Sequence, residues 1–283
     1  MSTTPDDERP LLEVRRGRFA RRANEPDDGA GPRPKRGWDT VFRLLTVLLG
    51  VALGLGALGW PSLVTPWFAS GNQLIHRVHN LGYGALVGVL LATPLVLQAR
   101  RPKTKPAAMQ QALLVSMAMV AAEIIALDLD PFVPSILVLV GVVAVVHPRR
   151  RDLLGLDVRP SAALATMAVA ASVPLVWFGV HQAALQRSGS PLDPHVRVHH
   201  WTTMAGLGLA IAVTSLFASV RTRGWRVPLW CAGLASMVYG AASIAYPTYA
   251  GASGRGWGTL AVIGGAAFIG VGELERRLRP TLR

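Results

Sequence analysis

Eight apolar runs, separated by short polar segments, constrain this chain more than any other feature of its sequence. A helix that spans the hydrocarbon core of a bilayer needs about 20 mostly apolar residues. Hydrocarbon offers no water to unpaired backbone groups, so such runs should be helical. The runs cover residues 41–60, 80–99, 107–127, 132–147, 161–181, 201–220, 227–247 and 257–272. The predicted fold class is an all-α integral membrane protein with eight transmembrane helices.

Composition supports this prediction and excludes other classes. Hydrophobic residues make up 51% of the 283-residue chain and charged residues only 16%, against about 25% charged in soluble domains. A single cysteine, Cys231, rules out an intramolecular disulfide. The net charge of +13 does not indicate nucleic acid, because the basic residues lie between the apolar runs and not on one folded face. The expected partner is the lipid bilayer, and protein partners stay open.

The basic residues also predict orientation. With the N-terminus placed inside, 24 Lys and Arg residues fall in cytoplasmic segments and only four in external ones. Cytoplasmic loops carry such an excess of Lys and Arg. The sequence therefore predicts a multi-pass protein of the plasma membrane with both termini in the cytoplasm.

The chain is expected to have three parts. Residues 1–38 are polar, with mixed charge and no apolar run, which predicts a disordered cytoplasmic tail. The remainder divides into four-helix halves at residues 39–159 and 160–283, because a shift of 120 places Arg77-Val78-His79 on Arg197-Val198-His199. Each half has an even number of helices, so the repeat should be parallel, with its pseudo-twofold axis along the membrane normal.

Histidines gather on the predicted outer face. The six that map there are His76, His79, His181, His195, His199 and His200. Histidine titrates near neutrality and is the commonest metal ligand. Because His79 and His199 occupy equivalent positions in the repeat, we expect them to face each other and to bind a cofactor, either haem or a transition metal.

Further metal ligands are predicted at His76, His195, His200 and Glu123. Glu123 lies inside the third run, where an ionisable group costs about 2.5 kcal/mol or more at the bilayer centre. It should therefore face the bundle and have a partner, such as one of the outer histidines. In the alternative interpretation, the histidines are interfacial groups bonded to water or lipid.

Eight helices in two halves, with a histidine at the outer start of the second helix of each half, resemble the haem A synthase family. This resemblance implies that His79 and His199 would be the second-helix haem ligands. The family's fourth-helix histidines have no counterpart here, and His76 and Val196 stand where it has a glutamate. Its first-loop signature is also absent, so the chain is not assigned to the family.

Two weaker resemblances concern short motifs. HVRVHH at 195–200 and HRVH at 76–79 resemble the histidine boxes of membrane hydroxylases and desaturases, which hold two irons. GASG at 251–254 resembles the serine motif of rhomboid proteases, but no histidine follows Ser253 to act as its base. The sequence favours a membrane protein that binds haem or metal in redox or assembly work. A transporter or non-catalytic scaffold is the alternative, and whether the chain is an enzyme stays open.

Overall fold

The computed structural model describes residues 36–68, 70–155 and 158–278 of the chain. Within these ranges the regular elements are all helical and no strand occurs. Residues 1–35, which hold most of the predicted disordered tail, lie outside the described part. The last three residues of the predicted tail, 36–38, instead begin the first helix.

Seven helices within these ranges are long and apolar enough to cross a membrane. Their bounds are Gly37–Gly56, Leu74–Arg100, Pro106–Ala126, Ala162–Ser188, His200–Val220, Arg226–Ala245 and Gly254–Leu278. The predicted span at 132–147 forms a helix of only 14 residues, Phe132–Val145, which falls short of that length. The described part of the chain is thus all-helical, with seven apolar helices of membrane-spanning length and one shorter apolar helix.

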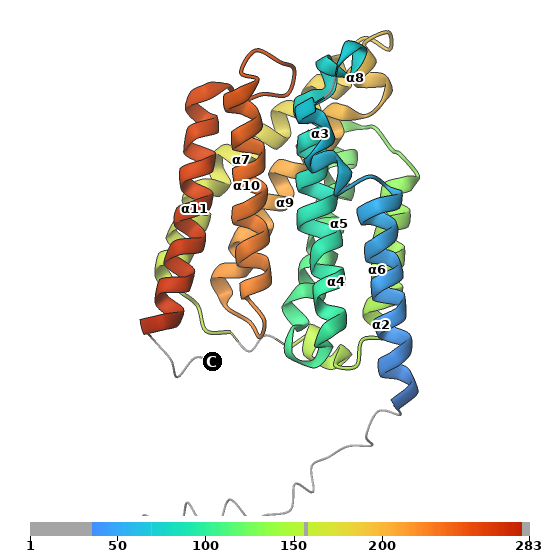
Figure 1. Cartoon of the computed structure of the whole chain (residues 1–283), viewed down its shortest axis with the longest axis vertical. Coiled ribbons are helices and arrows are strands. Elements are labelled where there is room, and N and C mark those ends of the chain that lie inside the picture. Colours follow the sequence, from blue (N-terminus) through green and yellow to red (C-terminus); the bar gives the residue numbers. More distant parts are fainter. Residues whose placement is uncertain (1–35, 69, 156–157, 279–283) are drawn as a thin grey trace, which may run out of the picture. The chain divides into compact units, whose positions relative to one another are not determined.

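The described chain runs through the following elements (Figure 1). They are α2 (Arg36–Val51), η1 (Ala52–Gly56), η2 (Pro61–Leu63), η3 (Thr65–Phe68), η4 (Gly71–His76), α3 (Arg77–Tyr83), η5 (Gly84–Ala92), α4 (Thr93–Arg100), η6 (Pro102–Thr104), α5 (Pro106–Ala126), α6 (Phe132–Val145), η7 (Arg150–Leu153), α7 (Ala162–Ser188), α8 (Pro194–Arg197), α9 (His200–Val220), α10 (Arg226–Ala245) and α11 (Gly254–Leu278). The second spanning helix, Leu74–Arg100, includes the end of η4 and all of α3, η5 and α4.

Four spanning helices form the interior of the bundle. In the second spanning helix, α5, α9 and α10, more than half of the apolar window is buried, whereas in α2, α7 and α11 less than a third is. The helix α9 packs against α7, α5 and α10, and α10 packs against α11. The outer helices therefore cover the inner four and turn most of their apolar surface outward, as expected of helices that face lipid.

The arginine-rich connections lie together at one end of the bundle. Lys103 forms an ion pair with Asp39 at the start of α2 (2.9 Å), and the backbone N–H of Ala107 donates to the carbonyl of Arg223 (3.2 Å). Arg221, which follows α9, pairs with Glu275 near the end of α11 (3.0 Å). The first turn of α2 and the last turn of α11 are thus at the same end (Figure 1), which we call the basic end.

A buried histidine at the basic end predicts a pH-dependent stability. His147 is 2% exposed, its ring lies edge-on to Phe42, and burial lowers its pKa to about 4. An unfolded chain takes up this proton near the ordinary pKa of about 6.5. The free energy of unfolding should therefore fall as the pH drops from about 6.5 to about 4, by up to about 3 kcal/mol.

Thermal or denaturant unfolding in detergent between pH 4 and 7 measures this loss. The variant His147→Gln, which cannot titrate, should have a flatter profile over that range than the unmodified protein. Profiles with the same slope would show that the stability loss comes from other groups.

Candidate metal centre

The first part of the site comes from the start of the second spanning helix. His76 ends η4 and His79 lies in the first turn of α3. Residues three apart lie on the same face of a helix, so both rings point toward the start of α9. Both lie at the end of the bundle opposite the basic end, which we call the outer end.

The second part comes from the segment that leads into α9. Asp193 caps the short helix α8: its Oδ1 accepts a hydrogen bond from the backbone N–H of His195 (2.8 Å) and lies 3.0 Å from His195 Nδ1. Pro194 follows at the first helical position, where proline is favoured. His200 is then the first residue of α9. Local capping thus fixes the direction of the His195 ring.

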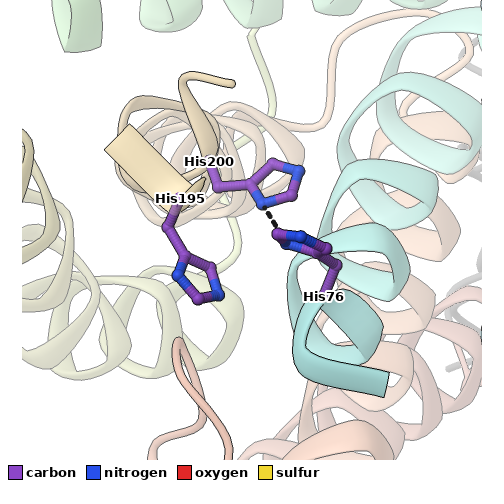
Figure 2. A group of neighbouring side chains, drawn as sticks. All are labelled: His76, His195 and His200. Carbon is purple, nitrogen blue, oxygen red and sulfur yellow. Dashed lines mark hydrogen bonds between the residues drawn. The ribbon is translucent and has the colours of Figure 1, made fainter. Parts of the chain in front are cut away.

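Three imidazoles from these two segments meet at one place (Figure 2). One ring nitrogen from each of His76, His195 and His200 lies within 4.8 Å of the corresponding nitrogens of the other two. The Nδ1 atoms of His76 and His200 are 3.0 Å apart and share a hydrogen bond. The rings of His76 and His195 are 4.9 Å apart between centroids. We call these three residues the histidine trio.

His79 lies directly beside the trio. Its ring stacks on His200 with a centroid distance of 4.9 Å and an interplanar angle of 14°, and its centroid is 4.8 Å from that of His195. The side chain is 0% exposed, and neither ring nitrogen has a hydrogen-bond partner in the described structure. Buried polar atoms without partners are uncommon, so the two nitrogens of this imidazole are free to bind a further group.

A glycine loop covers one side of His79. Gly251 has a φ of +80°, and a Cβ atom at this position would lie 2.9 Å from His79 Nε2. The close approach and the left-handed backbone both favour glycine here. The loop shields the imidazole from the outside of the bundle.

Asp193 is the carboxylate in direct contact with the trio through its bonds to His195. The donated backbone N–H of His195 holds the pKa of this carboxyl below its ordinary value. Asp193 therefore stays ionised at neutral pH. A carboxylate that accepts Nδ1–H fixes the tautomer of a histidine and leaves its Nε2 as the ligand atom. That Nε2 atom has only a long contact, 3.3 Å, with the carbonyl of Ile75.

The predicted pairing of His79 with His199 is not what the structure has. His199 Nδ1 lies 2.8 Å from both carboxylate oxygens of Asp128, and Thr202 donates to the same carboxylate (2.6 Å). The reason is the backbone of His199, which has a φ of +55°, whereas the matched position in the first half is already helical. Because of this left-handed conformation, the rings of His199 and His200 point in different directions. His199 reaches Asp128, and His79 stacks on His200.

Glu123 also stands apart from the trio. It is 1% exposed, as predicted for a group that faces the bundle, but its Oε1 accepts a hydrogen bond from the backbone N–H of Asp130 (3.1 Å). Its Oε2 is buried without a hydrogen-bond partner. The expected histidine partner is not bonded to it. His181 stacks on Trp177 in α7, outside the trio.

Sequence reasoning missed the residues that hold the ligands in place. Asp193 was detectable, because an aspartate directly before proline is a typical helix N-cap signal. Sequence reasoning also did not find the contacts of Asp128, whose carboxylate is bonded to His199 and Thr202. The contact between Gly251 and His79 joins positions far apart in sequence, and no local signal could have indicated it.

Comparisons with known protein families, with curated proteins and with solved structures find no match for this chain. The geometry of the site therefore carries the functional argument.

Proposed function

We propose that this protein binds one transition-metal ion through His76, His195 and His200, in redox or assembly work at the outer face of the membrane. The observation that carries the proposal is the convergence of three ring nitrogens within 4.8 Å from segments 120 residues apart. One hydrogen bond, between His76 and His200, does not by itself account for the approach of the third ring, that of His195.

The donor atoms favour a particular group of metals. Imidazole nitrogens suit zinc, copper, iron and nickel, whereas calcium and magnesium prefer oxygen ligands. Ligand nitrogens on one tetrahedral zinc ion lie about 3.4 Å apart. The trio, with separations up to 4.8 Å, would close by roughly 1 Å around such an ion. Rotation of the His76 and His200 side chains, whose shared hydrogen bond a bound ion would replace, supplies a movement of this size, while Asp193 holds the His195 ring.

A single ion fits the ring geometry better than haem. Two axial haem ligands point their nitrogens at the iron from opposite faces of the macrocycle. The most nearly parallel pair of rings in the cluster, His79 and His200, instead stacks face to face at 4.9 Å. Three ligands from the trio leave a fourth position on a tetrahedral ion for water, substrate or His79. Metal sites that activate a bound water or substrate also have three protein ligands and one open position.

The proposed orientation places the trio outside the cytoplasm. We infer eight crossings of the plasma membrane, with both termini in the cytoplasm and the trio at the opposite face. The excess of Lys and Arg at the basic end supports this orientation. The positions of the first turn of α2 and the last turn of α11 at that end support an even number of crossings.

The short helix α6, fourth of the apolar runs along the chain, is the crossing that brings the proposed number to eight. Its 14 residues rise about 21 Å, less than a typical hydrocarbon core of about 30 Å. The helix nevertheless follows the segment of Asp128, which is bonded at the outer end, and leads to His147, which contacts Phe42 near the basic end. A short span of this kind is accommodated by local thinning of the bilayer.

The arrangement of helices also supports the proposed 4+4 repeat. In the first half the order along the chain is outer helix, two inner helices, outer helix, and the second half has the same order. The inner helix α5 packs against α9, and α10 packs against the second spanning helix. These contacts are the ones that a pseudo-twofold axis along the membrane normal would exchange.

Equilibrium dialysis of the purified full chain against zinc tests the proposal. We expect one ion per chain at neutral pH and weaker binding in acid, because protons compete with the metal for imidazole nitrogens. A protein that stays free of metal, with no pH-dependent binding of zinc, copper or iron, would overturn the proposal. That result would favour a transporter or scaffold with interfacial histidines.

A further inference from the structure

A second candidate site lies among the helices of the second half of the bundle. A cavity of about 510 Å³ opens between α7, α9, α10 and α11. The helices α7 and α11 touch each other only slightly, although each packs closely on its inner neighbour. Most of the lining is apolar, including Leu175, Phe178 and Ile211 near mid-helix and Phe268 toward the basic end. The size is that of a typical small-ligand site.

Four of the hydroxyl, amide and imidazole side chains in the lining lie toward the outer end of this cavity. They are His181, Gln182, Tyr239 and Ser253, whereas Ser236 lies near mid-helix and Ser215 toward the basic end. Gln182 is 5% exposed, and its Oε1 is buried without a hydrogen-bond partner among the described residues. The lining residues include no Lys, Arg, Asp or Glu. The cavity therefore offers hydrogen bonds mainly at its outer end, and no ammonium, guanidinium or carboxylate group.

The cavity is elongated. It extends along α7 from Met167 to His181, which corresponds to about 21 Å of helix. An extended hydrocarbon chain matches this length and the mostly apolar lining.

We propose that this cavity binds an uncharged membrane lipid, with its apolar chain between α7 and α11 and a hydroxyl-bearing headgroup at Gln182. The headgroup hydroxyl donates to Gln182 Oε1, which has no other partner in the described structure. The site is independent of the metal proposal, because none of the trio residues lines it.

The two sites share one wall. Ala252 and Ser253 line the cavity, while the adjacent Gly251 lies against His79. The Tyr239 hydroxyl, which also lines the cavity, donates to the carbonyl of Gly251 (3.0 Å). A headgroup at Gln182 would therefore lie on the opposite side of this loop from the histidine cluster.

Photo-crosslinking tests the lipid site. The full chain is placed in phosphatidylcholine nanodiscs with a diacylglycerol that carries a diazirine in its acyl chain, and the labelled residues are mapped by mass spectrometry. We expect labels on cavity-lining residues of α7 and α11. Gly264→Leu should reduce this labelling by about tenfold or more, because the new side chain occupies space that the apolar chain needs.

The matched control is Gly270→Leu on the same helix. A Cβ atom at Gly264 or at Gly270 has no heavy atom within 4 Å, so both variants should fold, but only Gly264 lines the cavity. The smaller Gly264→Ala should give an intermediate loss. Equal labelling in the Gly264 and Gly270 variants would overturn the proposal.

The headgroup is tested by the same label on different lipids. Diacylglycerol should label the cavity several-fold more than phosphatidylglycerol with the same chain, since its hydroxyl can donate to Gln182 Oε1 and the lining has no Lys or Arg to pair with a phosphate. Gln182→Leu should reduce this preference but retain labelling by the chain. Stronger labelling by phosphatidylglycerol, or crosslinks from the cavity to a second copy of the chain, would contradict the proposal.

Discussion

Replacing His200 with alanine is expected to abolish high-affinity zinc binding, whereas replacing its neighbour His199 should leave it unchanged. His200 supplies a nitrogen of the trio, and His199 is bonded to Asp128. Replacing a residue that supports a ligand lowers metal affinity by roughly 10–100-fold, and removing the ligand itself should lower it further. Equilibrium dialysis or calorimetric titration of the purified variants measures the difference.

The two variants form a closely matched pair, because they remove the same ring from adjacent positions. Thermal unfolding without metal checks that both chains fold, and His200→Gln keeps a polar side chain of similar length if the alanine variant is unstable. Zinc binding that depends on His199 and not on His200 would instead support the pairing of His79 with His199 that the repeat predicts.

Asp193→Asn is expected to weaken zinc binding by about 10–100-fold without unfolding the site. Asparagine caps a helix as well as aspartate does, so α8 should be retained. The variant removes the negative charge that orients His195 through Nδ1 and stabilises a bound cation. The dissociation constant of zinc, measured at pH 7 and low salt, reports this loss.

Asp128→Asn provides the control for this prediction. Asp128 makes equivalent contacts with a histidine, but with His199, outside the trio. Its replacement should change the zinc affinity by much less than the replacement of Asp193. Equal losses in the two variants would indicate a general effect of outer-end charge and not a specific role of Asp193.

Seven of the eight apolar runs correspond to helices of membrane-spanning length among the described residues, whereas the run at 132–147 forms a shorter helix, and polar residues extend several of the others. The second helix was expected to begin at residue 80 but begins at Leu74. His76, Arg77 and His79 interrupt the apolar run, yet they continue the helix because two of them belong to a buried polar cluster. The residues that obscured this helix boundary are those of the candidate site.

The sequence indicated which histidines lie near one another but not how they pair. His76, His79, His195 and His200 lie in one cluster, and metal binding there stays a prediction. The sequence could not show that His199 turns away, because a left-handed φ at a residue other than glycine has no reliable local signal. The repeat therefore predicts equivalent positions for His79 and His199, but the left-handed backbone at His199 gives the two rings different partners.

Zinc X-ray absorption of the loaded protein tests the central claim most directly. The account predicts at least three imidazole nitrogens at about 2.0–2.1 Å from the metal, and one fewer in His200→Ala loaded at high zinc concentration. The spectrum of the His199→Ala protein should match that of the unmodified chain. A first shell of oxygen atoms only, without imidazole scattering, would contradict the histidine trio as a metal centre.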